Sequence, residues 1–138
     1  MWFYYALLSA LFAAFTAVFA KMGVSNVNSN LATGIRTVII LVLVWSIVFI
    51  KGEAKDIGSL SKFNIIFLVL SGIATGLSWL FYFKALQIGK VSQVAAVDKL
   101  SVAIAIILSV LFFKETLTLK TAIGALLIIG GTILFAMK

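Results

Sequence analysis

Long apolar stretches alternate with short polar connectors along the whole chain. A membrane-spanning helix needs about 20 consecutive apolar residues. Five stretches approach or exceed that length: residues 2–20, 31–50, 65–83, 91–113 and 119–137. The longest connector, residues 51–64, has room for a short surface helix at most. The pattern predicts an all-α integral membrane protein with five transmembrane helices, formed by residues 1–138 as one domain with no extramembrane domain.

The composition agrees with lipid as the surrounding medium. The chain has 138 residues, of which 64% are hydrophobic, and a mean hydropathy of +1.26. A soluble domain of this size cannot bury so much apolar surface. The first stretch has no basic residue before it and is long enough to span a bilayer, so we expect a retained helix rather than a signal peptide.

Several function classes are excluded by the residues that the chain lacks. It contains no cysteine and no histidine, which excludes thiolate or imidazole metal sites and catalysis by either side chain. No glycine-rich phosphate loop opens a helix. We therefore expect no enzyme activity, no catalytic residue, no cofactor and no metal. The net charge of +7 is better explained by lipid headgroups than by nucleic acid.

The basic residues are divided almost evenly between the two sides of the membrane. With five spans, one side carries five of them: Lys51, Lys55, Lys62, Lys114 and Lys120. The other side carries Lys21, Lys84, Lys90 and Lys138, with Arg36 and Lys99 deeper. Because an excess of Lys and Arg normally fixes orientation, the balance favours insertion both ways and an antiparallel homodimer. A single orientation with a separate partner is the alternative.

Two opposite charges lie inside the predicted spans. Arg36 is about 8 Å into the second span and Asp98 about 10 Å into the fourth, at about 1.5 Å per residue. An intramembrane charge is costly and asks for a partner. Asp98 is expected to pair with Arg36 or with a neighbouring lysine, either as a structural ion pair or as a charged gate. The gate or ion-pair candidates are Arg36, Lys84, Asp98, Lys99 and Glu115.

Hydroxyl and small residues recur at helical spacing in three spans. Residues three or four apart share a helix face. These faces predict a narrow polar cavity, with interhelical hydrogen bonding as the alternative. Trp79 and Tyr82 belong either to an interfacial aromatic belt or to a surface that contacts substrate. The substrate-cavity candidates are Ser9, Thr16, Ser71, Thr75, Ser78, Trp79, Tyr82, Asp98 and Ser101.

Glycines provide candidate positions for close helix packing. Gly72 and Gly76 form a G-x-x-x-G pair on the third span, and Gly124 and Gly131 lie seven residues apart on the fifth. Small residues let helix backbones approach one another in lipid. The four glycines are expected either to pack helices inside one subunit or to form a subunit interface.

Two segments resemble the EamA-like family of the drug/metabolite transporter superfamily. Residues 83–89, FKALQIG, are similar to the end of the family's third span. Residues 107–131 are similar to its tail signature, with Glu115 at the acidic position and Gly124 and Gly131 at the glycine positions. Arg36 matches the arginine that often opens the second span. The chain resembles one five-helix repeat, where family members usually carry two inverted repeats.

The resemblance implies a secondary active transporter of a small metabolite, amino acid or drug-like solute. It would work by alternating access as a two-unit, ten-helix assembly, multi-pass in the inner (plasma) membrane, most simply as a homodimer, antiparallel or parallel. A dual-orientation ion channel and a non-transporting membrane partner subunit are the alternatives. Two departures matter: residues 98–101, DKLS, stand where the family often has a proline, and the first span lacks the glutamate of the small multidrug-resistance relatives.

Overall fold

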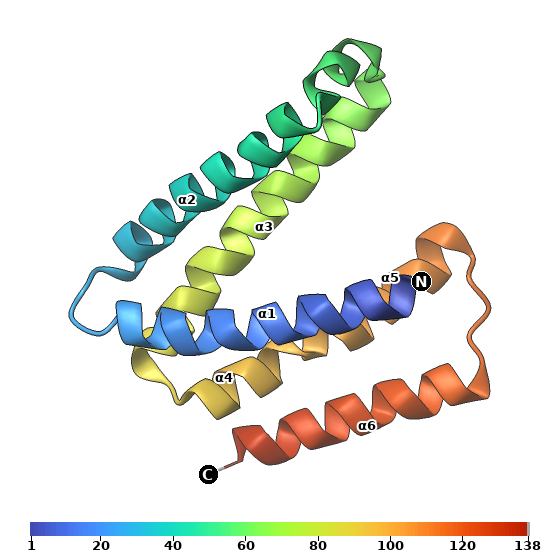
Figure 1. The fold of residues 1–138 in the computed structure, drawn as a ribbon. Helices are drawn as coiled ribbons and strands as arrows, with labels where there is room; N and C mark the ends of the chain where they lie inside the picture. Colours follow the sequence, from blue (N-terminus) through green and yellow to red (C-terminus); the bar gives the residue numbers. More distant parts are fainter. Residues whose placement is uncertain (138) are drawn as a thin grey trace. The chain divides into compact units, whose positions relative to one another are not determined.

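The computed structural model describes residues 1–137 as a series of helices, without a β-strand in that part of the chain (Figure 1). The elements are α1 (Trp2–Gly23), α2 (Ser29–Ile50), the 3-10 helix η1 (Glu53–Ser59), α3 (Lys62–Ile88), α4 (Val91–Asp98), α5 (Leu100–Phe113) and α6 (Leu119–Ala136). Lys138, which entered the charge comparison, lies outside the described residues.

Five helical segments are long and apolar enough to cross a membrane. They are α1, α2, α3, the segment Val91–Phe113 that contains α4 and α5, and α6. The prediction of an all-α protein with five transmembrane helices is therefore confirmed. We call Val91–Phe113 the interrupted span, because its helix is broken at Lys99.

The third span is longer than predicted. The hydropathy pattern placed its end at residue 83, whereas α3 continues to Ile88. Residues 84–88 are good helix formers even though they are less apolar, and Gly89 is the first residue that interrupts the helix. Lys84 and Gln87 consequently project from the last turns of α3 instead of from a loop.

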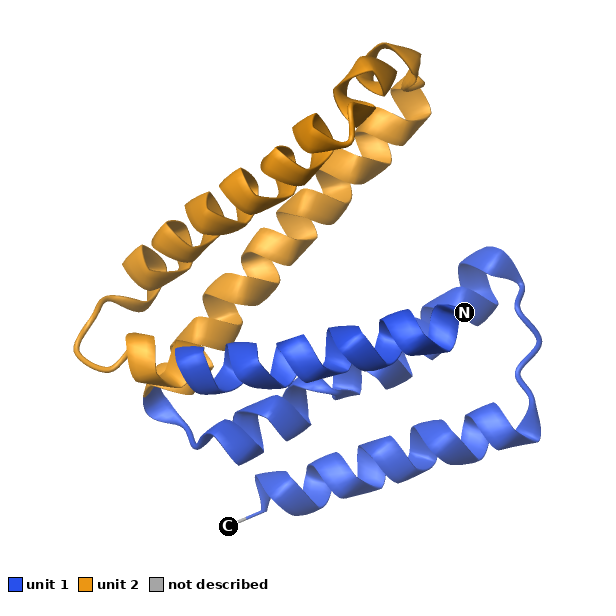
Figure 2. Cartoon of the chain, viewed as in Figure 1, with its two compact units in different colours: residues 1–19, 88–138 blue, residues 20–87 orange. Residues whose placement is uncertain are grey.

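The chain divides into two compact units, coloured separately in Figure 2. Unit 1 contains residues 1–19 and 88–138, and unit 2 contains residues 20–87. Unit 2 therefore holds the last turn of α1 with α2, η1 and α3, and unit 1 holds most of α1 with the interrupted span and α6. The single domain stays a prediction.

The core of unit 2 lies at the end where α1 connects to α2. Val24 and Leu86 are 1% and 0% exposed, and Phe83 is 3% exposed. The Lys21 ammonium donates a hydrogen bond to the Leu86 carbonyl oxygen at 2.6 Å. This cation satisfies a carbonyl in the last turn of α3, where the helix dipole is negative.

The connection between α1 and α2 is held by a side chain of α3. The Gln87 amide nitrogen donates to the Val27 carbonyl oxygen at 2.8 Å and to that of Val24 at 3.4 Å. One residue later, the Asn28 side-chain oxygen accepts from the backbone of Asn30 and Leu31 and caps the start of α2. These bonds fix the point at which α2 begins.

In unit 1, α6 packs against both α4 and α5. The buried positions there include Ala103 of α5 and Thr132 of α6, which are 4% and 5% exposed. The span ends at Lys114, whose positive φ of 53° turns the chain out of α5. Most apolar side chains of all five spans face outward from the chain. Such a surface is stable where lipid or another apolar surface covers it.

Candidate functional site

A positive charge lies on an aromatic surface inside unit 2. The guanidinium carbon of Arg36 is 4.5 Å from the ring centroid of Trp79 and 5.2 Å from that of Phe83. We call Trp79 and Phe83 the aromatic shelf. They are four residues apart on α3, so both rings lie on one helix face. A cation within about 6 Å of an aromatic centroid is attracted by the ring quadrupole.

A shallow groove follows α2 beside this contact. It has a volume of about 390 Å³ and is lined by Asn30, Thr33, Gly34, Thr37, Val38, Leu41, Gly76 and Leu80. The Thr33 hydroxyl donates to the Ser29 carbonyl oxygen at 2.9 Å, and the Thr37 hydroxyl donates to that of Thr33 at 2.8 Å. Both hydroxyl oxygens keep lone pairs that can accept a hydrogen bond. The surface of the groove is nevertheless almost wholly apolar.

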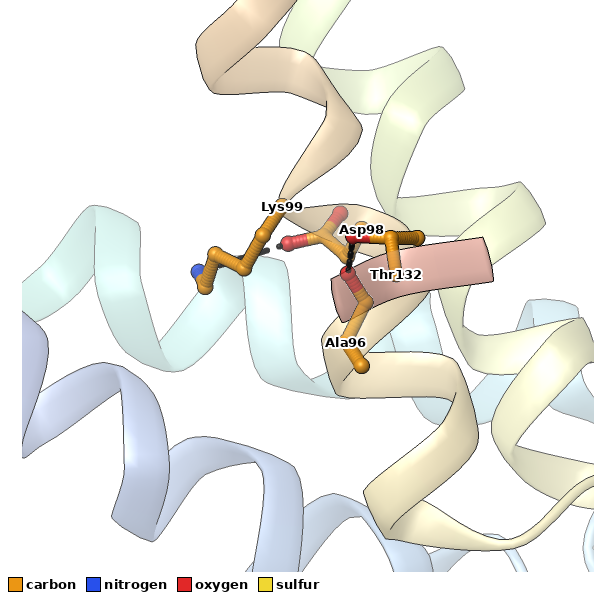
Figure 3. A network of polar contacts seen from close by, with 4 residues as sticks. All are labelled: Ala96, Asp98, Lys99 and Thr132. Atoms are coloured by element: carbon orange, nitrogen blue, oxygen red, sulfur yellow. Dashed lines mark hydrogen bonds and ion pairs between the residues drawn. The ribbon is translucent and has the colours of Figure 1, made fainter. Parts of the chain in front are cut away.

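The break in the interrupted span is the main feature of unit 1. The Lys99 amide bonds the Ala96 carbonyl oxygen at 3.1 Å, and the Val102 amide bonds that of Lys99 at 3.0 Å. Both are three-residue steps, tighter than the four-residue step of an α-helix. The Thr132 hydroxyl of α6 donates to the Ala96 carbonyl oxygen at 3.2 Å, as Figure 3 shows.

Asp98 and Lys99 form an ion pair at this break. The Lys99 ammonium is 3.6 Å from a carboxylate oxygen of Asp98, and their side chains are 57% and 39% exposed (Figure 3). Of the two partners expected for Asp98, the structure shows the neighbouring lysine. Arg36 belongs to the other unit, so its pairing with Asp98 stays a prediction.

The predicted polar face of α3 does not face α2. Ser71, Thr75 and Ser78 are exposed, whereas Gly76, Trp79 and Phe83 are turned into unit 2. The Thr75 hydroxyl donates to the Ser71 carbonyl oxygen of its own helix at 2.9 Å. These hydroxyls therefore do not line the groove between α2 and α3.

The remaining cavity candidates are distributed over unit 1 and the end of α3. Ser9 is exposed and Thr16 is partly buried on α1, and Tyr82 is partly buried on α3. Ser101 is exposed and follows the break. Its common face with Asp98 was predicted for a continuous helix, and the interruption at Lys99 removes that regular spacing. Whether any of these residues contacts a substrate stays a prediction.

The other charged candidates lie at the ends of spans. The Lys84 ammonium is 3.5 Å from the side-chain oxygen of Gln87, one turn along α3. Glu115 is exposed in the connection between α5 and α6, and its amide contacts the Ser109 carbonyl oxygen at 3.5 Å. Both positions are suited to water or headgroups more than to a buried site.

The four packing glycines have open space around them. A Cβ added at Gly72, Gly76, Gly124 or Gly131 would meet no heavy atom within 4 Å. No close approach of helices at these positions is present within either unit. Their use in a subunit interface stays a prediction.

Sequence reasoning missed three residues that shape these sites. Phe83 was not among the candidate residues, although its spacing of four from Trp79 indicated a shared helix face. Gln87 was left in a connector, because its position in α3 was not recognised. Thr132 is the only hydroxyl residue between Thr121 and the end of the chain, which is a signal for an interhelical hydrogen bond.

Comparison with known proteins assigns the chain to a family. The profile of the EamA-like transporter family matches residues 1–137. The chain belongs to the EamA-like transporter family. The resemblance inferred from the sequence is confirmed, and this EamA-like chain is a multi-pass membrane protein of a transporter family.

Two relatives of this EamA-like chain are similar in length to it. A Sinorhizobium protein named "Uncharacterized transporter in cobO 3'region" is 47% identical over 136 residues, which are 99% of this chain and 96% of that protein. An uncharacterized protein of Methanocaldococcus jannaschii is 40% identical over 70 residues, 51% of each chain. No solved structure matches the EamA-like chain.

Proposed function

We propose that the chain is a secondary active transporter of a small organic solute in the inner (plasma) membrane. Membership of the EamA-like transporter family and the Sinorhizobium relative named as a transporter support transport in general. Alternating access in a ten-helix assembly of two five-helix units is the mechanism that we propose for it.

The break in the interrupted span carries this proposal. α4 has eight residues, and a helix of that length is about 12 Å long. The break is therefore well inside the membrane. Irregular backbone at such depth is tolerated where protein or a wet cavity covers it. Discontinuous transmembrane helices form the substrate and ion sites of many secondary transporters.

The break brings groups that suit a gate. Lys99 and Asp98 are paired but still partly exposed, so each can also contact a solute. The Ala96 carbonyl oxygen is held by Thr132, which ties the break to α6. We assign Asp98 and Lys99 to binding or gating, and Thr132 to positioning of the break.

Pairing of two copies is supported by lengths and charges. The match covers 96% of the Sinorhizobium relative, so that protein corresponds to one five-helix unit. Transporters commonly combine two inverted units around a pseudo-two-fold axis in the membrane plane. The nearly even division of basic residues between the two sides permits both orientations of this chain.

Counterflow in proteoliposomes tests the proposal. Purified chain is reconstituted with a panel of unlabelled metabolites inside, and uptake of the same labelled compounds is followed. We expect transient accumulation of at least one compound, abolished or strongly reduced by Asp98→Asn. The matched control is Glu53→Gln, which removes a carboxylate from η1 without affecting the break.

The outcomes separate the three candidate functions. Counterflow that depends on Asp98 supports the transporter. Flux far above transporter turnover without counterflow would indicate a channel. Absence of flux for the whole panel, by protein that is folded and oriented, would contradict the proposal and favour a non-transporting partner subunit.

A further inference from the structure

Within unit 2, the positive charge of Arg36 has no carboxylate near it. The acids of residues 20–87 are Glu53 and Asp56, both in η1 beyond the opposite end of α2. From Arg36 to the end of α2 at Ile50 is about 21 Å along the helix. A carboxylate oxygen of Glu53 is instead 3.9 Å from the ammonium of Lys51. The charge of Arg36 is not neutralised within its own unit.

The aromatic shelf contacts Arg36 through its rings, and Tyr82 is a further electrostatic neighbour of this guanidinium. Trp79 and Phe83 contact the guanidinium through their rings. Such contacts attract the cation and orient its plane, whereas the five N–H donors lie in that plane. No hydrogen bond from this guanidinium to a protein acceptor is found among the described residues. An oriented guanidinium with free donors binds a carboxylate through two parallel hydrogen bonds.

The groove beside Arg36 suits the rest of such a ligand. Its lining residues Thr33 and Thr37 are one turn before Arg36 and directly after it on α2. The Thr33 and Thr37 hydroxyls are bonded within α2, and Val38, Leu41 and Leu80 help to make the groove surface apolar. A volume of about 390 Å³ is within the usual range for a site that holds a small organic molecule.

From this juxtaposition we infer that Arg36, on the shelf of Trp79 and Phe83, binds the carboxylate of a small substrate whose short apolar tail lies in the α2–α3 groove. The inference rests on the proposed transport function and names its substrate class. A lipid phosphate offers the same charge. We propose the carboxylate rather than the lipid, because the apolar groove is the size of a short alkyl tail.

Fluorescence of Trp79 gives a direct binding test. In Trp2→Phe/Trp45→Phe protein, Trp79 is the sole tryptophan, and the cation on its ring makes its emission sensitive to movement of Arg36. The full chain, in detergent without phospholipid, is titrated with 4-methylpentanoate and with the uncharged 4-methylpentanamide. We expect a saturable change with the carboxylate, and at least about tenfold weaker binding of the amide, because charged hydrogen bonds are lost.

Variants assign the effect to Arg36. Arg36→Gln should weaken carboxylate binding by about tenfold or more, and Arg36→Lys should weaken it less, because it keeps the charge and loses the bidentate geometry. Lys55→Gln removes one positive charge from η1 and should leave binding unchanged. If Arg36→Gln elutes as aggregate, Arg36→Lys and the acid–amide comparison still decide the question.

Several results would overturn the inference. They are the absence of a saturable change with 4-methylpentanoate, equal binding of acid and amide, and binding that survives Arg36→Gln. A signal from added phosphatidylglycerol alone would make Arg36 a lipid contact and would overturn it too. Counterflow unaffected by Arg36→Gln would remove this site while leaving transport intact. Carboxylate binding without any counterflow would remove the proposed transport instead.

Discussion

The Thr132 hydroxyl of α6 donates a hydrogen bond to the carbonyl oxygen of Ala96, 3.2 Å away, beside the break between α4 and α5. The single hydroxyl proton is shared with the Ile128 carbonyl oxygen of its own helix, 2.8 Å away. Thr132 is 5% exposed, so water does not compete for this contact. The bond between the two helices therefore helps to fix the position of the break.

Replacing Thr132 with valine should loosen the interrupted span. The substitution keeps the shape and removes the donor to Ala96, which should lower the free energy of unfolding by about 1 kcal/mol, a typical value for an interhelical hydrogen bond in a membrane. The measurement is thermal or denaturant unfolding in detergent, with counterflow alongside. Thr132→Ser should restore most of the stability.

Thr75→Val is the matched control for this prediction, because the Thr75 hydroxyl bonds only within α3. The two variants lose the same chemical group, one from an interhelical contact and one from the surface of α3. Equal stability of the Thr132 and Thr75 variants would contradict a positioning role for Thr132.

The contact between Arg36 and Trp79 should appear as a coupling energy. A double-mutant cycle of Arg36→Met and Trp79→Leu isolates the pairwise term from the separate losses of packing. We expect coupling of about 0.5–2 kcal/mol, the range of cation–π contacts from exposed to desolvated sites. The measurement is equilibrium unfolding of the two single variants, the double variant and the parent in detergent.

Phe81→Leu provides the control cycle with Arg36→Met. Phe81 is on the same helix two residues after Trp79, is 73% exposed and is not one of the rings under Arg36. Its coupling should be zero within error. Comparable coupling for Phe81 and Trp79 would mean that the shelf does not hold the arginine specifically.

The five spans could be predicted because a helix that crosses lipid needs about 20 consecutive, mostly apolar residues. The break at Lys99 could not, because Val91–Phe113 is apolar enough on average to be one continuous span. The two adjacent charges, Asp98 and Lys99, were recognised as intramembrane charges and not as the place where a helix is interrupted. Average hydropathy tells whether a segment enters the membrane, and it does not report backbone hydrogen bonding within it.

The faces of α3 show a second limit of the sequence. Helical spacing places Ser71, Thr75 and Ser78 on one helix face, but it does not say which face meets α2. That choice depends on packing between large side chains, and Phe83 and Leu86 are buried in unit 2 while the hydroxyl residues remain exposed. Arg36, Trp79 and Phe83 were each visible in the sequence, but their contact depends on how α2 packs against α3.

Gln87 should be needed to order the connection between α1 and α2. Gln87→Leu keeps the size of the side chain and removes the donor to the carbonyl oxygens of Val27 and Val24. We expect faster amide hydrogen exchange over residues 24–28 and easier proteolysis there, because local opening becomes less costly. Gln93→Leu in α4 is the control substitution. Equal effects of Gln87→Leu and Gln93→Leu on residues 24–28 would contradict this role of Gln87.

Both orientations in the membrane should be detectable from two serines on opposite sides. Ser25 and Ser59 are exposed, in the α1–α2 connection and at the end of η1, and the chain has no cysteine of its own. In intact cells, Ser25→Cys and Ser59→Cys should each react partly with an impermeant thiol reagent, because half of the copies present each site outside. Removing Lys51, Lys55 and Lys62 by Gln substitution should make Ser59→Cys react almost completely and Ser25→Cys hardly at all, because the remaining basic residues favour the opposite side as cytoplasmic. As a graded control, Lys114→Gln alone should shift the labelling of both sites in the same direction by a smaller amount. Strictly one-sided labelling of the parent chain would contradict the antiparallel homodimer.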